Sequence, residues 1–129
     1  MTWFTIWIFI WDDGTEDTAT VDSNENINPE SLHQQALEYI EFQLGLSDGD
    51  VEAVPPTKYC GLFKYTAEPL RIACTVTWRR EFYQHLAWYM KCCEVEHQFV
   101  RSGSLPTLSE YWGHRLGTSS IDAYSALAE

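Results

Sequence analysis

The chain has 129 residues, of which 45% are hydrophobic and 15% aromatic, so a packed domain with one modest core is predicted instead of a disordered chain. Eight basic and 19 acidic residues give a formal net charge of −11. This charge argues against a nucleic-acid-binding surface and against docking on an anionic membrane, because both need a basic footprint. An anionic substrate would need metal ions or locally placed arginines.

The first predicted element is a helix over residues 2–13, which is apolar on nearly all sides and is therefore expected to be buried on most of them. The acidic and polar stretch 14–28 is predicted to end this helix and to form a loop. The apolar run is too short to span a bilayer, and it lacks the basic start and the cleavage site of a signal peptide. We therefore expect no membrane insertion and a cytoplasmic location.

A second helix is predicted to begin at Pro29, with Asn28 as its N-cap, because proline fits the first helical position. Apolar residues then recur at helical spacing as far as Leu44, and Gly45 is the expected C-terminal stop. Residues 47–58 contain Asp, Gly and a Pro-Pro pair and are predicted to form a loop.

One long helix is predicted over roughly 67–101, starting near Thr66 and Pro69, because apolar residues recur every three to four positions. Its end is predicted at Ser102-Gly103-Ser104. The paired arginines Arg79 and Arg80 are interpreted as part of a solvated face.

A capping box is predicted next, with Thr107 as N-cap and Glu110 three positions later, followed by a short helix to about Arg115. The segment 117–120 interrupts this helix, and a helical pattern resumes over 121–129. Since no segment shows sustained strand alternation, the predicted fold class is all-α.

The four cysteines contain no CxxC pair and are interpreted as reduced packing residues of a cytosolic protein: Cys60, Cys74, Cys92 and Cys93.

Four acids follow the first apolar run within six positions: Asp12, Asp13, Glu16 and Asp17. On a helix, Asp12 and Glu16 lie one turn apart on one face, where like charges repel and a divalent cation would remove the repulsion. Because Mg²⁺ favours a few carboxylates together with water and phosphate oxygens, this spacing indicates half of a metal site for a phosphorylated ligand. The alternative is an acidic, solvated loop after a buried helix.

The second informative stretch is Pro-Thr-Leu-Ser-Glu-Tyr-Trp-Gly-His-Arg-Leu-Gly-Thr-Ser-Ser over residues 106–120. Together with the acids at 12–16 it resembles the class I terpene cyclases, particularly the fungal sesquiterpene type. That family has an aspartate-rich DDxxD/E motif and, later, a Pro-x-Leu-x-x-Tyr helix running into Arg-x-x-Thr-Ser. Both motifs occur here in family order, and the resemblance covers essentially the whole chain, as a single part (1–129) of a class I terpenoid synthase helical bundle.

The resemblance implies a role for each matching residue. Asp12 would be the principal metal ligand, Asp13 would support it, and Glu16 would complete the motif, although Asp17 could take that role in a motif one residue longer. The implied metal is Mg²⁺, three ions in the complete enzyme.

In the second motif, Arg115 would bind the substrate diphosphate, Thr118 would be the linker, and Ser119 would turn its backbone carbonyl toward the substrate. The reaction implied is ionisation of a prenyl diphosphate, such as farnesyl diphosphate, and cyclisation of the allylic cation. Phe9 shares the helix face of Asp12 and is the candidate cation–π wall of the substrate pocket, with ordinary core packing as the alternative.

Some family features are missing from these 129 residues, including the helices before the first motif and the second metal motif of Asn, Ser and Glu. We therefore expect an internal fragment that is inactive alone. Two other functions stay open: a chain-elongating prenyltransferase fragment, and a non-catalytic cyclase relative acting as an acidic helical interaction protein. The sequence leaves the oligomeric state open.

Overall fold

The computed structural model describes residues 2–20, 29–49, 52–119 and 121–128, with residues 13–20 described only by their helical backbone. All regular structure within these ranges is α-helical, which confirms the predicted class. The chain divides into two compact units, residues 1–79 and 80–129, and each unit is described separately.

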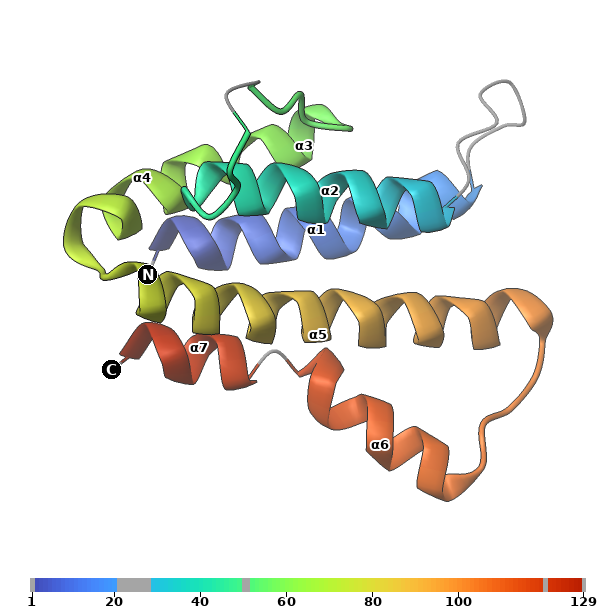
Figure 1. Cartoon of the computed structure of the whole chain (residues 1–129). Helices are drawn as coiled ribbons and strands as arrows, with labels where there is room; N and C mark the ends of the chain where they lie inside the picture. Colours follow the sequence, from blue (N-terminus) through green and yellow to red (C-terminus); the bar gives the residue numbers. More distant parts are fainter. Residues whose placement is uncertain (1, 21–28, 50–51, 120, 129) are drawn as a thin grey trace. The chain divides into compact units, whose positions relative to one another are not determined.

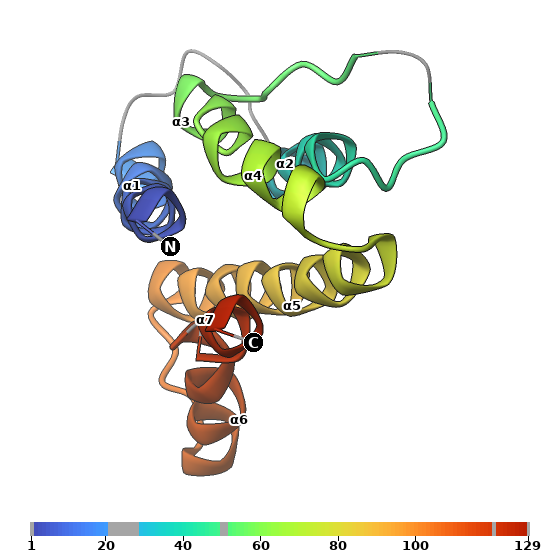
Figure 2. The same ribbon diagram turned by 90° about the vertical axis from the view of Figure 1, so that its left-hand side faces the viewer.

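The first unit contains α1 (Thr2–Thr20), α2 (Pro29–Gln43), α3 (Lys58–Gly61), α4 (Lys64–Ala73) and the start of α5 (Val76–Ser102). Both α3 and α4 pack against α1, and α4 also packs against α2 (Figures 1 and 2). The short helix α3 lies directly after the predicted loop and was not predicted from the sequence.

Aromatic side chains form the core of the first unit. Phe4, Trp7 and Trp11 recur along one face of α1 and are 1%, 1% and 3% exposed. The ring of Trp7 stacks on that of Trp11 with centroids 5.8 Å apart, and Phe63 meets Trp7 edge-on at 5.0 Å. Stacked and edge-on pairs at these distances add to the stabilisation from burial alone. The loss of the Phe63 side chain would therefore loosen the contact between α1 and the α3–α4 segment.

The predicted boundaries and burial of the first helix were wrong. The helix continues through Gly14 to Thr20, because glycine weakens a helix by only about 1 kcal/mol and no proline occurs before Pro29. Its opposite face is also open, since Trp3, Ile6 and Phe9 are 55%, 41% and 66% exposed. α1 therefore has one buried face and one exposed face, although its sequence is apolar nearly all round.

The ends of α2 agree with prediction where they are described. Pro29 is the first helical residue, and Gly45 adopts a φ of 70°, a left-handed conformation that favours glycine. Asn28, the predicted N-cap, lies outside the described residues. Arg79 is not simply a solvated residue, because its guanidinium donates a hydrogen bond to the carbonyl of Leu44 at the end of α2. A cation at this end also complements the helix dipole.

The long helix predicted over 67–101 is two helices, and Pro69 lies inside the first of them instead of at its start. The backbone of Cys74 is extended (φ −116°, ψ 147°), and the Thr75 hydroxyl accepts a hydrogen bond of 3.2 Å from the Trp78 amide. Three β-branched residues, Thr75 to Thr77, have low helix propensity, so a new helix start is favoured there.

The second unit contains the rest of α5, α6 (Leu108–Thr118) and α7 (Ile121–Ala128). α5 ends as predicted, with Gly103 at a φ of 67°. The predicted capping box is present: the Thr107 hydroxyl accepts from the Glu110 amide at 3.3 Å, and the Glu110 carboxylate accepts from the Thr107 amide at 2.8 Å. These bonds satisfy two backbone amides at the start of α6 that have no hydrogen-bond partner within the helix.

Candidate functional site

The first predicted site segment lies on α1. The backbone stays helical through position 16, so positions 12 and 16 are one turn apart on the same side, as the metal-site prediction requires. Asp12 is exposed, whereas the side chains of Asp13, Glu16 and Asp17 lie outside the described residues. Among described residues no group of three His, Cys, Asp or Glu could hold a metal ion, but that set omits most of the acidic segment. The metal site therefore stays a prediction.

Phe9 lies on the open face of α1, with 66% of its surface exposed. The alternative interpretation, that Phe9 is an ordinary core residue, does not fit this exposure. At 100° per residue, positions 9, 12 and 16 fall within one sector of the helix, opposite the buried aromatic residues. This placement is compatible with a role beside the acidic segment, which itself stays a prediction.

The second predicted site segment borders a pocket of about 340 Å³ in the second unit. The pocket lies between the last turns of α5, the connection 103–106 and α6. Each helix contributes three residues at i, i+3 and i+4 spacing, which places them on one helix face. The residues are Glu96, Phe99 and Val100 on α5, and Tyr111, His114 and Arg115 on α6.

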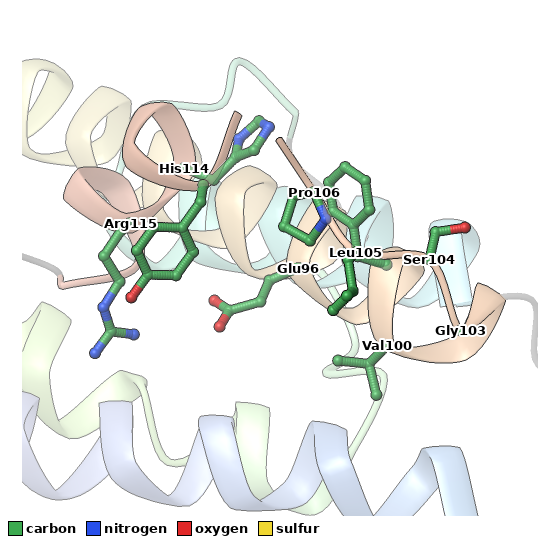
Figure 3. Close-up of a pocket in the computed structure, with 10 residues that line it drawn as sticks. Glu96, Val100, Gly103, Ser104, Leu105, Pro106, His114 and Arg115 are labelled. Carbon is green, nitrogen blue, oxygen red and sulfur yellow. The ribbon is translucent and has the colours of Figure 1, made fainter. Parts of the chain in front are cut away.

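The pocket has an apolar side and a charged side. Val100, Leu105 and Pro106 are apolar, and Phe99 lies beside His114 with ring centroids 6.4 Å apart. In Figure 3 the carboxylate of Glu96 is directed toward the side on which Arg115 lies, away from Val100 and Leu105. Pockets with a mostly apolar lining and a few convergent polar groups are typical ligand sites.

Two polar groups of the pocket are available to a ligand. Arg115 is exposed, and the structure shows no ion pair for it among the described residues. The Nδ1 atom of His114 is buried and has no hydrogen-bond partner in the same set. A buried polar atom without a partner costs free energy, so a ligand or water that pairs with it would be favoured. A guanidinium suits phosphate and carboxylate oxygens because its donors form a planar fork.

The helix break after Arg115 begins later than predicted. α6 continues to Thr118, and its cap is Ser119, whose backbone is still helical (φ −73°, ψ −10°). The Thr118 hydroxyl donates to the carbonyl of Arg115 at 3.2 Å, and the Ser119 hydroxyl donates to that of Leu116 at 2.7 Å. These hydroxyls satisfy carbonyls that a helix end leaves open, which explains the longer helix. Ser120 lies outside the described residues.

Comparison with known proteins agrees with the two motifs. A model of the family described as terpene synthase family 2, C-terminal metal binding, matches residues 4–129. The chain belongs to this terpene synthase family. The match covers both the acidic segment of α1 and the Arg115 helix.

A curated relative of this terpene synthase chain is the sesquiterpene cyclase hepA of Aspergillus oryzae (strain ATCC 42149 / RIB 40). The two sequences are 29% identical over 134 residues, which cover 98% of this chain and 36% of the relative. The chain thus spans about a third of the length of the relative. No solved structure matches the chain.

The sequence indicated Arg115 as a candidate site residue but gave no sign of the pocket residues around it, namely Glu96, Tyr111 and His114. The i, i+3, i+4 spacing on each helix was visible in the sequence, but nothing there indicated that the two faces meet. The four cysteines are free thiols, as predicted, and three of them are buried. In the described part of the terpene synthase chain, no helix is both long and apolar enough to cross a membrane.

Proposed function

We propose that this chain carries substrate-ionising residues of a metal-dependent sesquiterpene cyclase, with farnesyl diphosphate as the prenyl diphosphate substrate. The observation that supports this most is the family match over residues 4–129, which joins the acidic motif and the Arg115 motif in one continuous alignment. The Aspergillus relative is a sesquiterpene cyclase, which supports a fifteen-carbon substrate.

In this proposal Asp12, Asp13 and Glu16 hold Mg²⁺. The donor chemistry fits, because carboxylates one helical turn apart can share an ion that keeps several waters and binds phosphate oxygens. When bound, the metal supplies positive charge that stabilises the leaving diphosphate. The exposure of Asp12 on α1 supports this role.

Arg115 is the diphosphate ligand from the second unit. Its guanidinium would donate hydrogen bonds to the diphosphate oxygens while the carbon–oxygen bond breaks and both bonding electrons leave with the diphosphate. Thr118 and Ser119 follow it at the end of α6, where the Thr118 hydroxyl is bonded to the carbonyl of Arg115 itself. That bond couples the linker position to the arginine backbone, and the Ser119 carbonyl would face the cation.

Phe9 is the proposed cation–π residue. Once ionisation has occurred, the allylic cation would be stabilised by the negative face of an aromatic ring within about 6 Å. The exposed ring of Phe9 is available for such a contact.

Titration calorimetry with inorganic diphosphate, with and without Mg²⁺, tests the assignment of Arg115. We expect Arg115→Ala to weaken binding at least about tenfold, which corresponds to about 1.4 kcal/mol. Arg101→Ala is the matched control, because Arg101 is an exposed arginine of the same unit that does not line the pocket. Equal losses in the two variants would show that only general charge matters and would contradict the assignment.

A further inference from the structure

α6 is attached to the rest of its unit near one end. Among the described residues of α6, Gly117 is the one that is buried. The large apolar residues of the helix are exposed: Leu108, Tyr111, Trp112 and Leu116 at 73%, 44%, 57% and 69%. Figure 1 shows the same geometry, since the C-terminal end of α6 lies near α5 and its N-terminal end diverges from it. The two helices thus form a wedge with Gly117 at its apex.

Gly117 permits a very close helix contact. A Cβ atom added to Gly117 would lie 2.2 Å from Sγ and 2.8 Å from Cβ of Cys92, and 3.0 Å from Nε1 of Trp88. Carbon atoms in contact normally lie about 3.5–4.0 Å apart. Cys92 is 1% exposed. Its Cβ atom is bonded directly to the α5 backbone, so this atom cannot rotate away. Any side chain at position 117 would therefore push α6 off α5.

The pocket lies inside this wedge, so the apex controls its geometry. Arg115 is two residues from Gly117, about 3 Å along the helix axis, and Tyr111 is six residues away, about 9 Å. A helix transmits a displacement at one end to its whole length. In enzymes, a misplacement of about 1 Å caused by a mutation far from the reacting atoms can cost about a hundredfold in rate.

We infer that Gly117 is a positioning residue: by lacking a side chain it lets α6 rest on Cys92 and Trp88 of α5, and this contact fixes Arg115 against the α5 wall of the pocket. Gly117 acts through Arg115 and touches no ligand itself. The part that concerns diphosphate binding rests on the proposed function, whereas the helix contact does not.

The test compares two glycine-to-alanine variants of the same helix in the full chain. Gly117→Ala introduces the clash, and Gly113→Ala is the matched control, because a Cβ at Gly113 would meet nothing within 4 Å. Alanine also favours helix formation over glycine, so the control should fold at least as well. The readouts are the indole N–H resonance of Trp88, assigned with Trp88→Phe, and the dissociation constant for inorganic diphosphate with Mg²⁺.

We expect Gly117→Ala to shift the Trp88 resonance and to raise the dissociation constant about tenfold or more, while Gly113→Ala changes neither. Cys92→Gly removes both close atoms of Cys92, so the double variant with Gly117→Ala should recover most of the affinity. If Gly117→Ala unfolds the chain, the same second substitution should restore its helical circular dichroism.

An unshifted Trp88 resonance in Gly117→Ala, or a failure of Cys92→Gly to rescue, would overturn the inference. If the unsubstituted chain does not bind diphosphate, the proposed function fails, and the Trp88 resonance and its rescue still decide whether Gly117 sets the helix contact. If Arg115→Ala abolishes binding while Gly117→Ala binds normally, the positioning role alone is wrong.

Discussion

Cys60 lies in α3 with 0% exposure, and burial raises the pKa of its thiol from 9.0 to about 12. Burial has this effect because the thiolate loses solvation that the neutral thiol does not need. At pH 8 Cys60 should therefore react with iodoacetamide much more slowly than the partly exposed Cys74. Mass spectrometry of peptides after timed alkylation measures both rates, and preferential labelling of Cys60 would contradict the buried position of this thiol.

The same thiol predicts a pH dependence of stability. The unfolded chain loses the Cys60 proton near pH 9, whereas the folded chain keeps it until about pH 12. The contribution of Cys60 is therefore fully present below pH 9 and is lost as the pH rises toward 12. Urea unfolding at pH 7.5 and pH 10.5 measures how much the free energy of unfolding falls between the two pH values. We expect this fall to be smaller in Cys60→Ala than in the unsubstituted chain, with Cys74→Ala as control.

At the scale of helices, the capping box of α6 determines where that helix begins. Hydrogen bonds from the Thr107 hydroxyl and amide lower the pKa of Glu110, and the nearby His114 lowers it further. The lowered pKa means that the carboxylate contribution is present above the unfolded pKa, near 4.5, and is lost as the pH falls through the folded value.

We expect Thr107→Ala to destabilise α6 by about 1 kcal/mol at neutral pH. Amide hydrogen exchange of the first turn of α6 measures the effect, and protection there should also fall on acidification in the unsubstituted chain. Ser109→Ala is the control, because Ser109 is an exposed residue of the same turn outside the capping box. Unchanged exchange in Thr107→Ala would show that the box does not hold the helix start.

Local signals predicted the helix ends that depend on a few adjacent residues. These ends are the start at Pro29, the stops at Gly45 and Gly103, and the capping box at Thr107. Each depends only on neighbouring backbone groups, so the local sequence is enough to predict it. The break at Cys74 was missed because the apolar spacing continues through it, and only the three β-branched residues after it weaken the helix.

The candidate site was predictable as residue types but not as an arrangement. Arg115 was identified from its motif, yet the pocket beside it depends on the approach of α6 to α5 at Gly117. In a helical sequence, a glycine indicates only a position of low helix propensity. The structure shows that Cys92 occupies the space where a side chain at Gly117 would lie.

For the whole chain, we expect a complete metal site to need ligands beyond the acidic segment of α1. We therefore expect the 129-residue chain, incubated with farnesyl diphosphate and Mg²⁺, to form no cyclic product above a protein-free blank, as measured by gas chromatography with mass spectrometry. The purified Aspergillus relative serves as the positive control. Cyclic product at rates well above the blank would show that this chain holds a complete catalytic site.

Under the proposed function, which rests on the family match over residues 4–129, Asp12 and Arg115 both take part in binding diphosphate. A double-mutant cycle on the binding of inorganic diphosphate, with Asp12→Asn and Arg115→Ala measured with and without Mg²⁺, decides whether the two residues act together. We expect Asp12→Asn to abolish the gain in affinity caused by Mg²⁺, and the double variant to bind within about threefold of the weaker single variant, because residues that share a ligand are coupled. Losses that simply add, or a gain from Mg²⁺ that survives in Asp12→Asn, would contradict it.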